Sequence, residues 1–535
     1  MLVTLPEPDL AGATDLVDLV GGMLGTAVRH LAANGGPDSN QQVAYDLAHA
    51  MAQLETARTM LEYGAMGRDE SLMACAFTAD MVHDVVTRVA GREAAWGVDL
   101  ASISAGHEFM SRFRDADFVA SLADLGDHRH LDAEMEMVAD TFRSFAEKVI
   151  KPHAEHVHRH NDDVPEEIIT GLAEMGAFGL SVPAEYGGFS EGGSNEYIGM
   201  VVATEELSRC SLGIGGSLIT RPEILTRALV KGGTDEQKAE WLPKLAVAEV
   251  MPAVAVTEPD YGSDVAGIKV TATPAAGPNG EPGWAINGVK TWCTFGARAN
   301  VLMLLARTDP DRSKTHRGLS LFIVPKPRGE GHGFEFVQEG TGGKMEGRAI
   351  DTIGYRGMHS YEIALDNWWV PAANLVGGDD GMGKGFFMQM AGFENGRLQT
   401  AARAVGVMQA AFELALDYAQ NRVVFGSPIF DYQLTRAKLG RMAMLTQAGR
   451  QFSYRVARLM ADGGGTAEAA MAKAYVCKAA EWVTREAMQI HGGMGYAEEY
   501  TVSRLFVDAR VMSIFEGADE TLCLKVIARR LTDTP

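Results

Sequence analysis

Apolar residues recur at helical spacing through the first half of the chain. From about residue 15 to residue 115 they return every three or four positions, which places them on one face of a helix. One such face consists of Val43, Leu47, Ala50, Met51, Leu54 and Leu61. A second helical stretch runs from Ser71 to Val89, and more helix follows from about 128 to 250, with breaks at Pro152, residues 182–188 and Gly232. The pattern predicts two successive helical regions.

The period of the pattern changes between about residues 251 and 375. Short apolar runs at 254–256, 301–305 and 319–324 alternate with Gly, Pro, Asn and Asp, which is typical of strands and turns. Asn287-Gly288 stands between two further runs, and because both residue types tolerate the positive φ of a type I′ turn, it predicts a hairpin. The middle of the chain is therefore predicted to be an antiparallel β domain, and helical spacing returns from Gly385 onward.

These changes of period predict a mainly α protein with one β domain. We divide the chain into an N-terminal helical extension (1–120), a helical domain (121–250), a middle β domain (251–375) and a C-terminal helical bundle (376–535). A chain of 535 residues is longer than one hydrophobic core usually serves, so several domains are expected.

Composition narrows the classes of partner. A formal net charge of -22 argues against a nucleic-acid binder or a protein that binds anionic membranes, because both need a basic surface. The five cysteines are far apart and form no CxxC pair, which indicates reduced thiols. The N-terminus lacks the features of a signal or transit peptide, and no uninterrupted apolar run reaches the roughly 18 residues that span a bilayer. We expect a cytoplasmic protein without membrane insertion.

Two segments of the β region combine polar and aromatic groups suited to a ligand. Residues 256–264, Val-Thr-Glu-Pro-Asp-Tyr-Gly-Ser-Asp, form a strand followed by a loop whose N–H groups and hydroxyls can meet an anion or the edge of a heterocycle. Residues 290–294, Lys-Thr-Trp-Cys-Thr, place an aromatic face beside a hydroxyl, which suits a flat ring system. A simple turn and a buried core tryptophan are the alternative interpretations.

The C-terminal region carries a candidate base. Residues 489–496, Gln-Ile-His-Gly-Gly-Met-Gly-Tyr, end a helix with glycines that permit close backbone approach. Twenty residues later, Glu516 stands between Phe515 and Gly517. Apolar surroundings raise the pKa of a carboxyl group, which suits proton abstraction. A solvent-exposed loop carboxylate is the alternative.

One histidine cluster imitates a metal site. His153, His156, His158 and His160 lie in a polar stretch without the spacing of a zinc site, so we interpret them as a solvated helix face and expect no metal.

The ordered series of motifs resembles the acyl-CoA dehydrogenase family over about residues 125–535. The series is VTEPxxGSD, KTWxT, Arg422 to Ile429, Gln433, QIHGGMGY and FEG. The resemblance implies a helical domain, a small antiparallel β domain and a C-terminal four-helix bundle, here preceded by an extension. It also implies FAD as cofactor, an acyl-CoA substrate and an electron-transfer flavoprotein as electron acceptor.

The resemblance further implies which residues hold FAD. The positions that line the flavin ring are Val256, Thr257, Trp292 and Thr294, with Thr294 hydrogen-bonding near flavin N5, and Ser263 is shared between flavin and CoA. The positions that hold the diphosphate and adenosine across a subunit interface are Arg422, Phe425 and Gln433, closed off by Gln489, Gly492 and Gly493. The cofactor would then lie between two subunits of a homo-oligomer.

Glu516 matches the family's catalytic base, which removes the α-proton while the β-hydride moves to flavin N5. Some members place the base on a mid-sequence helix instead, but this chain has Gly396 at that position. The enolate oxygen would be bound by the backbone N–H of the base and a flavin ribityl hydroxyl. Positions implied near the substrate are Glu394, Arg397 and Gly517; Ala518 and Glu520 replace a Thr and a Gln that commonly contact FAD.

Arg221 places a permanent cation where the acyl tail should lie. It follows a segment, residues 206–217, that is shorter than in typical relatives. A substrate carboxylate would be a suitable bidentate partner, and a pair with Glu223 is the alternative. Together with the extension, this resembles the subfamily that converts (2S)-methylsuccinyl-CoA to mesaconyl-CoA. The other candidates are another short branched-chain acyl-CoA dehydrogenase, an acyl-CoA oxidase and a non-catalytic scaffolding relative.

Overall fold

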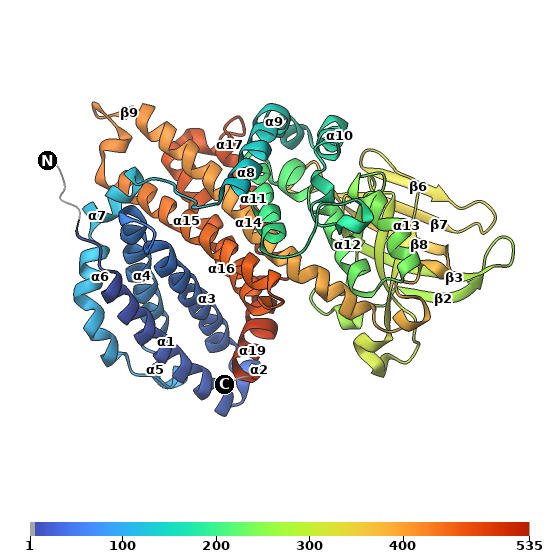
Figure 1. Ribbon diagram of the computed structural model, residues 1–535, viewed down its shortest axis with the longest axis horizontal. Coiled ribbons are helices and arrows are strands. Elements are labelled where there is room, and N and C mark those ends of the chain that lie inside the picture. Colours follow the sequence, from blue (N-terminus) through green and yellow to red (C-terminus); the bar gives the residue numbers. More distant parts are fainter. Residues whose placement is uncertain (1–5, 534–535) are drawn as a thin grey trace. The chain divides into compact units, whose positions relative to one another are not determined.

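The computed structural model describes residues 6–533, which form two compact units (Figure 1). The first, here called the terminal unit, contains the chain up to Asp140 and again from Arg397 onward. The second, the sheet unit, is Thr141–Gly396. Helix α14 (Gly385–Asn421) starts in the sheet unit and continues in the terminal unit.

The terminal unit is built from helices. Its N-terminal elements are α1 (Leu10–Ala33), α2 (Gly36–Ser39), α3 (Gln41–Gly64), α4 (Arg68–Val89), α5 (Glu93–Trp96), α6 (His107–Phe113) and α7 (Ala116–Ser121). Its C-terminal elements after α14 are the short strands β9 (Val423–Val424) and β10 (Ser427–Pro428), then α15 (Gln433–Ala461), α16 (Thr466–His491), α17 (Thr501–Met512), α18 (Asp519–Thr521), a π-helical segment (Leu522–Ile527) and α19 (Ala528–Asp533). The helices expected at Ser71–Val89 and around Leu439 are confirmed.

Helix α3 lies at the centre of this unit. It packs against α1 and α4 from the extension and against α15 and α16 from the C-terminal half. Leu47 and Leu54, two residues of the apolar face seen in the sequence, are buried in these contacts, as are Ala50 and Ala57. The extension and the C-terminal helices therefore share one hydrophobic core, which stabilises both.

Helix α1 is long and apolar enough to meet the length and composition of a membrane span. Apolar side chains on one of its faces, including Leu16, Val20 and Leu24, are buried, and α1 packs against α3 and α4. A buried core helix meets the same length and composition test.

The sheet unit contains an eight-stranded sheet in the order β1-β4-β2-β3-β8-β7-β6, with β5 also paired to β4. The strands are β1 (Pro252–Ala255), β2 (Thr271–Ala276), β3 (Pro282–Thr294), β4 (Val301–Arg307), β5 (Leu319–Pro325), β6 (Gly333–Val337), β7 (Lys344–Ile350) and β8 (Ser360–Pro371). Most pairs are antiparallel as predicted, but β4 pairs in parallel with β1 and with β2. The sheet is therefore mixed.

The prediction of a hairpin at Asn287-Gly288 is wrong. Both residues lie inside β3, whose 13 residues continue past them. Gly288 has φ +131°, and the pairing of β3 with β8 shifts register there. The Asn287 side chain accepts a hydrogen bond from the N–H of Asn367 at 2.8 Å. The signal that resembled a turn therefore marks a β-bulge, which uses the same positive φ without reversing the chain.

The sheet unit also contains helices. They are α8 (Ala133–Phe145), which starts in the terminal unit, α9 (Lys151–His160), α10 (Glu166–Glu174), α11 (Ser194–Cys210), α12 (Arg221–Gly232) and α13 (Asp235–Ala246). Apolar residues of α12 and α13, such as Leu225 and Leu242, share a core with Leu305 and Leu321 of the sheet. Helix α12 starts with Arg221-Pro222, and proline suits the first turn because its missing N–H would be unpaired there.

A buried ion pair joins two segments of the sheet unit. Lys290 on β3 is fully buried and donates to Glu258 Oε1 at 2.9 Å and to the carbonyl of Val256 at 2.9 Å. Glu258 also accepts from the N–H groups of Lys269 and Val270. Burial lowers the pKa of Lys290, although the charge of Glu258 opposes that shift. The pair thus holds residues 256–258 against β3.

We expect Lys290→Met to destabilise the protein strongly. The substitution leaves the Glu258 carboxylate buried without its cation, which costs about 3–5 kcal/mol, and the thermal midpoint should fall by roughly 10 °C. Differential scanning calorimetry measures this. The matched control is Lys269→Met, because Lys269 pairs with Asp260 at 3.7 Å on the surface, and its midpoint should stay near that of the parent. Equal midpoints for the two variants would contradict the assignment.

Candidate active site

The two β-region motifs meet in the structure. The N–H of Thr291 donates to the carbonyl of Thr257 at 2.8 Å, so the loop after β1 lies directly beside the end of β3. The pairing of β3 with β8 shifts register between Lys290 and Cys293, and Trp292 has φ +56°. Such a bulge re-aims a side chain, and that of Trp292 is 55% exposed. The indole is therefore not the core tryptophan of the alternative interpretation.

The other residues predicted to contact the flavin differ in how exposed their side chains are. The Thr294 hydroxyl lies 3.2 Å from that of Ser360 on β8, at the end of β3. Val256 belongs to the hydrophobic core of the unit, so its side chain packs inward. Ser263 is exposed on the loop that follows the Glu258–Tyr261 turn. Trp292, Thr257 and Thr294 thus form an accessible polar and aromatic group.

Arg221 is buried at the start of α12. It is 5% exposed, and its guanidinium donates to the carbonyl of Ser217 at 3.1 Å and to the hydroxyl of Ser217 at 3.5 Å. The Ser217 hydroxyl is also hydrogen-bonded to the hydroxyl of Tyr355. Glu223 lies 3.5 Å from Arg227 instead. Within residues 6–533, Arg221 forms no ion pair with an acidic side chain, so the alternative interpretation, a pair with Glu223, is not borne out.

Glu516 lies in a chain reversal between α17 and α18. Its φ is +54° and that of Gly517 is +98°, so two successive residues are left-handed. The reversal is closed by a hydrogen bond from the N–H of Asp519 to the carbonyl of Ser513 at 3.2 Å. One carboxylate oxygen of Glu516, Oε2, is buried and has no hydrogen-bond partner among the described residues. Its backbone N–H donates to no other described residue.

Lys473 of α16 forms a hydrogen bond with this reversal. Its ammonium donates to the carbonyl of Gly517 at 2.5 Å. Burial lowers the pKa of Lys473, while the nearby charges of Cys477, Glu516 and Asp519 raise it and that of Arg397 lowers it further. The chain therefore places a cation within electrostatic range of the Glu516 carboxylate without pairing the two.

The predicted adenosine and diphosphate contacts lie on the surface of the terminal unit. Phe425 has φ +52°, stands at the tip of the β9–β10 hairpin and is 96% exposed. Arg422 and Gln489 are exposed, and Gln433 donates to Asp117. Gly492 has φ +59°, and a Cβ at Gly492 or Gly493 would meet no atom within 4 Å. This face is open to a ligand or to a second chain.

The remaining predicted residues divide between the two units. Glu394, in the sheet unit, and Arg397, in the terminal unit, lie on α14 and are partly buried. Ala518 precedes α18, and Glu520 is exposed on it. Each unit therefore brings together its own part of the predicted site.

Cysteines and histidines follow the sequence interpretation. All five cysteines are free and buried, which confirms that they form no disulfide. His153 Nε2 lies 2.6 Å from Glu167 Oε1, and His156 Nε2 lies 3.1 Å from Asp162 Oδ2, on the surface around α9.

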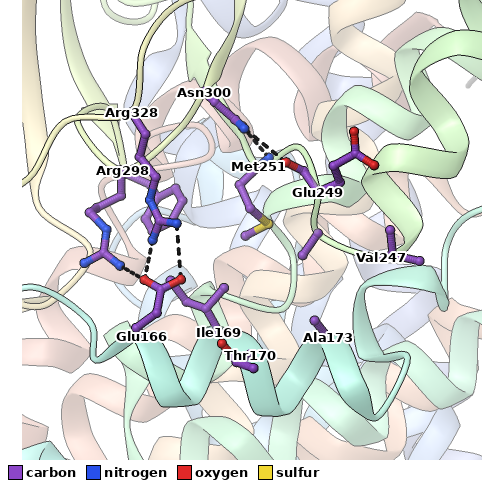
Figure 2. Close-up of a pocket in the computed structure, with 12 residues that line it drawn as sticks. Glu166, Ile169, Thr170, Ala173, Val247, Glu249, Met251, Arg298, Asn300 and Arg328 are labelled. Atoms are coloured by element: carbon purple, nitrogen blue, oxygen red, sulfur yellow. Dashed lines mark hydrogen bonds and ion pairs between the residues drawn. The ribbon is translucent and has the colours of Figure 1, made fainter.

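A cavity of about 230 Å³ opens elsewhere in the sheet unit (Figure 2). Figure 2 shows Glu166 of α10 pointing toward Arg298 and Arg328, and it forms hydrogen bonds with both. Partial burial would raise the pKa of Glu166, but the hydrogen bonds and charges of Arg328 and Arg298 bring it below its ordinary value. No predicted site residue lines this cavity. The guanidiniums of Arg298 and Arg328 are both already hydrogen-bonded to the Glu166 carboxylate.

Sequence inspection missed the residues that support the site. Lys290 and Glu258 belong to the quoted motifs, yet nothing in the sequence pairs a lysine with a glutamate 32 positions away. Lys473 lies in an alanine-rich helix with no motif of its own. A charged residue inside an otherwise apolar helical face was the only available signal.

Three family models match successive parts of the chain. The Acyl-CoA dehydrogenase, N-terminal domain matches residues 132–249, the middle domain matches 253–368 and the C-terminal domain matches 383–532. Residues before 132 lie outside all three.

Similar proteins agree with these matches. A (2S)-methylsuccinyl-CoA dehydrogenase of Cereibacter sphaeroides is 44% identical over 404 residues, covering 75% of this chain and 70% of that protein. A glutaryl-coenzyme A dehydrogenase glutaryl-CoA complex has a TM-score of 0.67 at 30% identity, covering 76% of this chain and 97% of the other. Butyryl-CoA dehydrogenase from Megasphaera elsdenii has a TM-score of 0.66 at 30% identity, covering 75% and 99%. The chain belongs to the acyl-CoA dehydrogenase family and is an oxidoreductase that acts on acyl-CoA.

Proposed function

We propose that this enzyme dehydrogenates the α,β-carbon bond of (2S)-methylsuccinyl-CoA, giving mesaconyl-CoA, with Glu516 as the base. The observation that carries the assignment of the base is the buried, unpartnered Oε2 of Glu516 in a left-handed reversal. A structural carboxylate is normally hydrogen-bonded when buried, so an unpaired oxygen favours a role in proton transfer.

Glu516 and its own backbone provide two parts of the chemistry. The α-proton of a thioester is weakly acidic, so its removal needs a base and a donor to the carbonyl oxygen. The unpaired Oε2 serves as the base. The backbone N–H of Glu516 serves as the donor, because it forms no hydrogen bond to another described residue. The left-handed backbone makes both groups available at one residue.

The chain offers groups that fit FAD. The exposed indole of Trp292, beside Thr257 and near the hydroxyl of Thr294, suits a flat ring that needs hydrogen bonds. The open space at Gly492 and Gly493 permits close approach of a diphosphate or nucleoside. When bound, FAD supplies the acceptor of the β-hydride at N5. Ser263, Arg422, Phe425, Gln433 and Gln489 are proposed to complete the binding of FAD.

Arg221 supports a substrate with a distal carboxylate. A buried guanidinium without an acidic partner is costly, and a carboxylate compensates it with two parallel hydrogen bonds. The positive end of the α12 dipole adds to the preference for an anion at this position. The name of the Cereibacter sphaeroides relative, a (2S)-methylsuccinyl-CoA dehydrogenase, supports this particular dicarboxylic thioester as the substrate proposed here.

The exposed hairpin supports a homo-oligomer with FAD at the subunit interface. Phe425 exposes nearly its whole ring at the tip of β9–β10, and Leu434 and Tyr496 are also exposed on this unit. Large exposed apolar side chains favour a protein contact. We propose an electron-transfer flavoprotein as the acceptor that reoxidises the enzyme.

We expect Glu516→Gln to retain FAD but to slow substrate-dependent flavin bleaching by about 100- to 10,000-fold, because a general base contributes that much. Stopped-flow absorbance under anaerobic conditions measures the rate. Glu498→Gln, which alters an exposed carboxylate before α17, is the control and should bleach normally. Undiminished bleaching by Glu516→Gln would remove Glu516 as the base. Peroxide release in air without an acceptor would assign the enzyme as an oxidase.

We expect Arg221→Met to lower kcat/KM for methylsuccinyl-CoA by about 30-fold or more, because an unpaired buried carboxylate costs about 2–5 kcal/mol or more. The value for butyryl-CoA, which lacks the carboxylate, should be maintained. Steady-state assays with an artificial electron acceptor compare the two substrates. Lys231→Met on the exposed face of α12 is the control. If both substrates lose activity equally, or if only uncharged acyl chains react with the parent, the carboxylate assignment is wrong.

A further inference from the structure

We propose that Tyr45 and His49 of the N-terminal extension are positioning residues for the base: they hold Asp519, and through it the reversal that carries Glu516. This inference rests on the proposed function of Glu516. It gives the extension, which lies outside the matched family models, a part in positioning the base.

The contacts of Asp519 carry the proposal. Asp519 is 3% exposed, and the Tyr45 hydroxyl donates to its Oδ2 at 2.5 Å. His49 lies one helical turn further along α3, and its Nε2 is 3.1 Å from the same oxygen. An ionised carboxylate only accepts hydrogen bonds, so the His49 Nε2 carries the proton in this contact. Two donors of α3 therefore converge on one oxygen of the C-terminal half.

Asp519 remains ionised in this environment. Burial alone would raise its pKa, but the hydrogen bond and charge of His49, the hydrogen bond of Tyr45 and the charge of Lys478 bring it to about 2. Charge-assisted hydrogen bonds are roughly twice as strong as neutral ones. The contact is thus strong enough to constrain the main chain to which Asp519 belongs.

That main chain is one end of the base reversal. The N–H of Asp519 donates to the carbonyl of Ser513, which joins the two ends of the segment that contains Glu516. The Ser513 hydroxyl donates to Glu481 of α16, and Lys473 of α16 holds the carbonyl of Gly517. Helix α16 therefore anchors one end and the middle of the reversal. Helix α3 anchors the other end with two hydrogen bonds, and Lys478 of α16 lies 3.7 Å from the same carboxylate oxygen.

A hydrogen-bond cluster describes this site better than a metal centre does. His49, Asp519 and Cys523 bring potential ligand atoms within 4.8 Å of one another. Asp519 Oδ2, however, already accepts from Tyr45 and His49, and the Lys478 ammonium is 3.7 Å away. A nearby cation disfavours a second one, and a structural zinc takes four ligands. Tyr45 and His49 therefore act as hydrogen-bond donors to the Asp519 carboxylate.

The consequence for catalysis is geometric. The base and the bound thioester must be aligned closely, and a misplacement of 1 Å costs about 100-fold in rate. Removing the donors of α3 takes away both hydrogen bonds to Asp519 Oδ2 and loosens this end of the reversal, while the Glu516 side chain is unchanged. The rate of proton abstraction should fall more than substrate or flavin binding.

The test uses the full-length, FAD-loaded enzyme. We would compare Tyr45→Phe, His49→Leu, the double variant and His49→Gln with the parent, measuring anaerobic flavin reduction at saturating methylsuccinyl-CoA, or at saturating concentration of whichever acyl-CoA reduces the parent. Solvent exchange of the substrate α-proton in D2O, followed by NMR, reports the base directly. The double variant should lose about 10- to 100-fold in both rates, with unchanged KM and flavin content. His49→Gln keeps a donor and should recover most of the rate lost in His49→Leu.

Tyr63→Phe is the matched control. Tyr63 lies on the same helix and is more fully buried than Tyr45, but its hydroxyl donates to the carbonyl of His128, which is not part of the reversal. It should keep the parental rates. Parental rates in the double variant, a loss that follows flavin content or thermal midpoint, or a His49→Gln variant as slow as His49→Leu would each overturn the proposal. If the double variant does not fold, the rate of Tyr45→Phe relative to Tyr63→Phe decides. Glu516→Gln in the same assays separates the two hypotheses, because parental rates there would reject the base itself.

Discussion

The left-handed reversal at Glu516 and Gly517 is the constraint on which the proposed active site depends. A non-glycine residue in this conformation costs about 1–2 kcal/mol, so its surroundings must hold it there. Lys473 does so through the carbonyl of Gly517, and Asp519 does so through the carbonyl of Ser513. In return, the reversal leaves both a carboxylate oxygen and the N–H of Glu516 without partners among the described residues. The proposed base and the proposed hydrogen-bond donor therefore lie together at this strained residue.

A left-handed backbone conformation also occurs at two other predicted site residues. Trp292 and Phe425 are also left-handed, and both expose their rings, one at a β-bulge and one at a hairpin tip. Behind Trp292, the buried pair of Lys290 and Glu258 ties the loop after β1 to β3. At Trp292 and at the Glu516–Gly517 reversal, strained backbone thus lies next to a support that is buried and charged. This combination is typical of sites whose geometry must be set before the ligand binds.

The extension is integrated into the terminal unit. Helix α3 packs against α15 and α16 as well as against its own neighbours α1 and α4. A buried polar contact, from Tyr45 and His49 to Asp519, lies within this packing. Buried polar groups specify one arrangement of helices because any other leaves them unpaired. The extension therefore shares both core and polar network with the C-terminal helices.

The sequence by itself determined the order of helical and β regions and the ordered motifs, because periodicity and motif spacing are local properties. The family resemblance of those motifs made Glu516 the candidate base. Its four-part division at residues 120, 250 and 375 stays a prediction. Only the tertiary structure decided that Asn287-Gly288 is a bulge, that β4 pairs in parallel and that Arg221 has no acidic partner among the described residues. It alone brought Tyr45 and His49 to Asp519, 470 or more positions away. Pairing between strands and contacts between distant helices depend on which surfaces the whole chain buries together, and no local pattern records that.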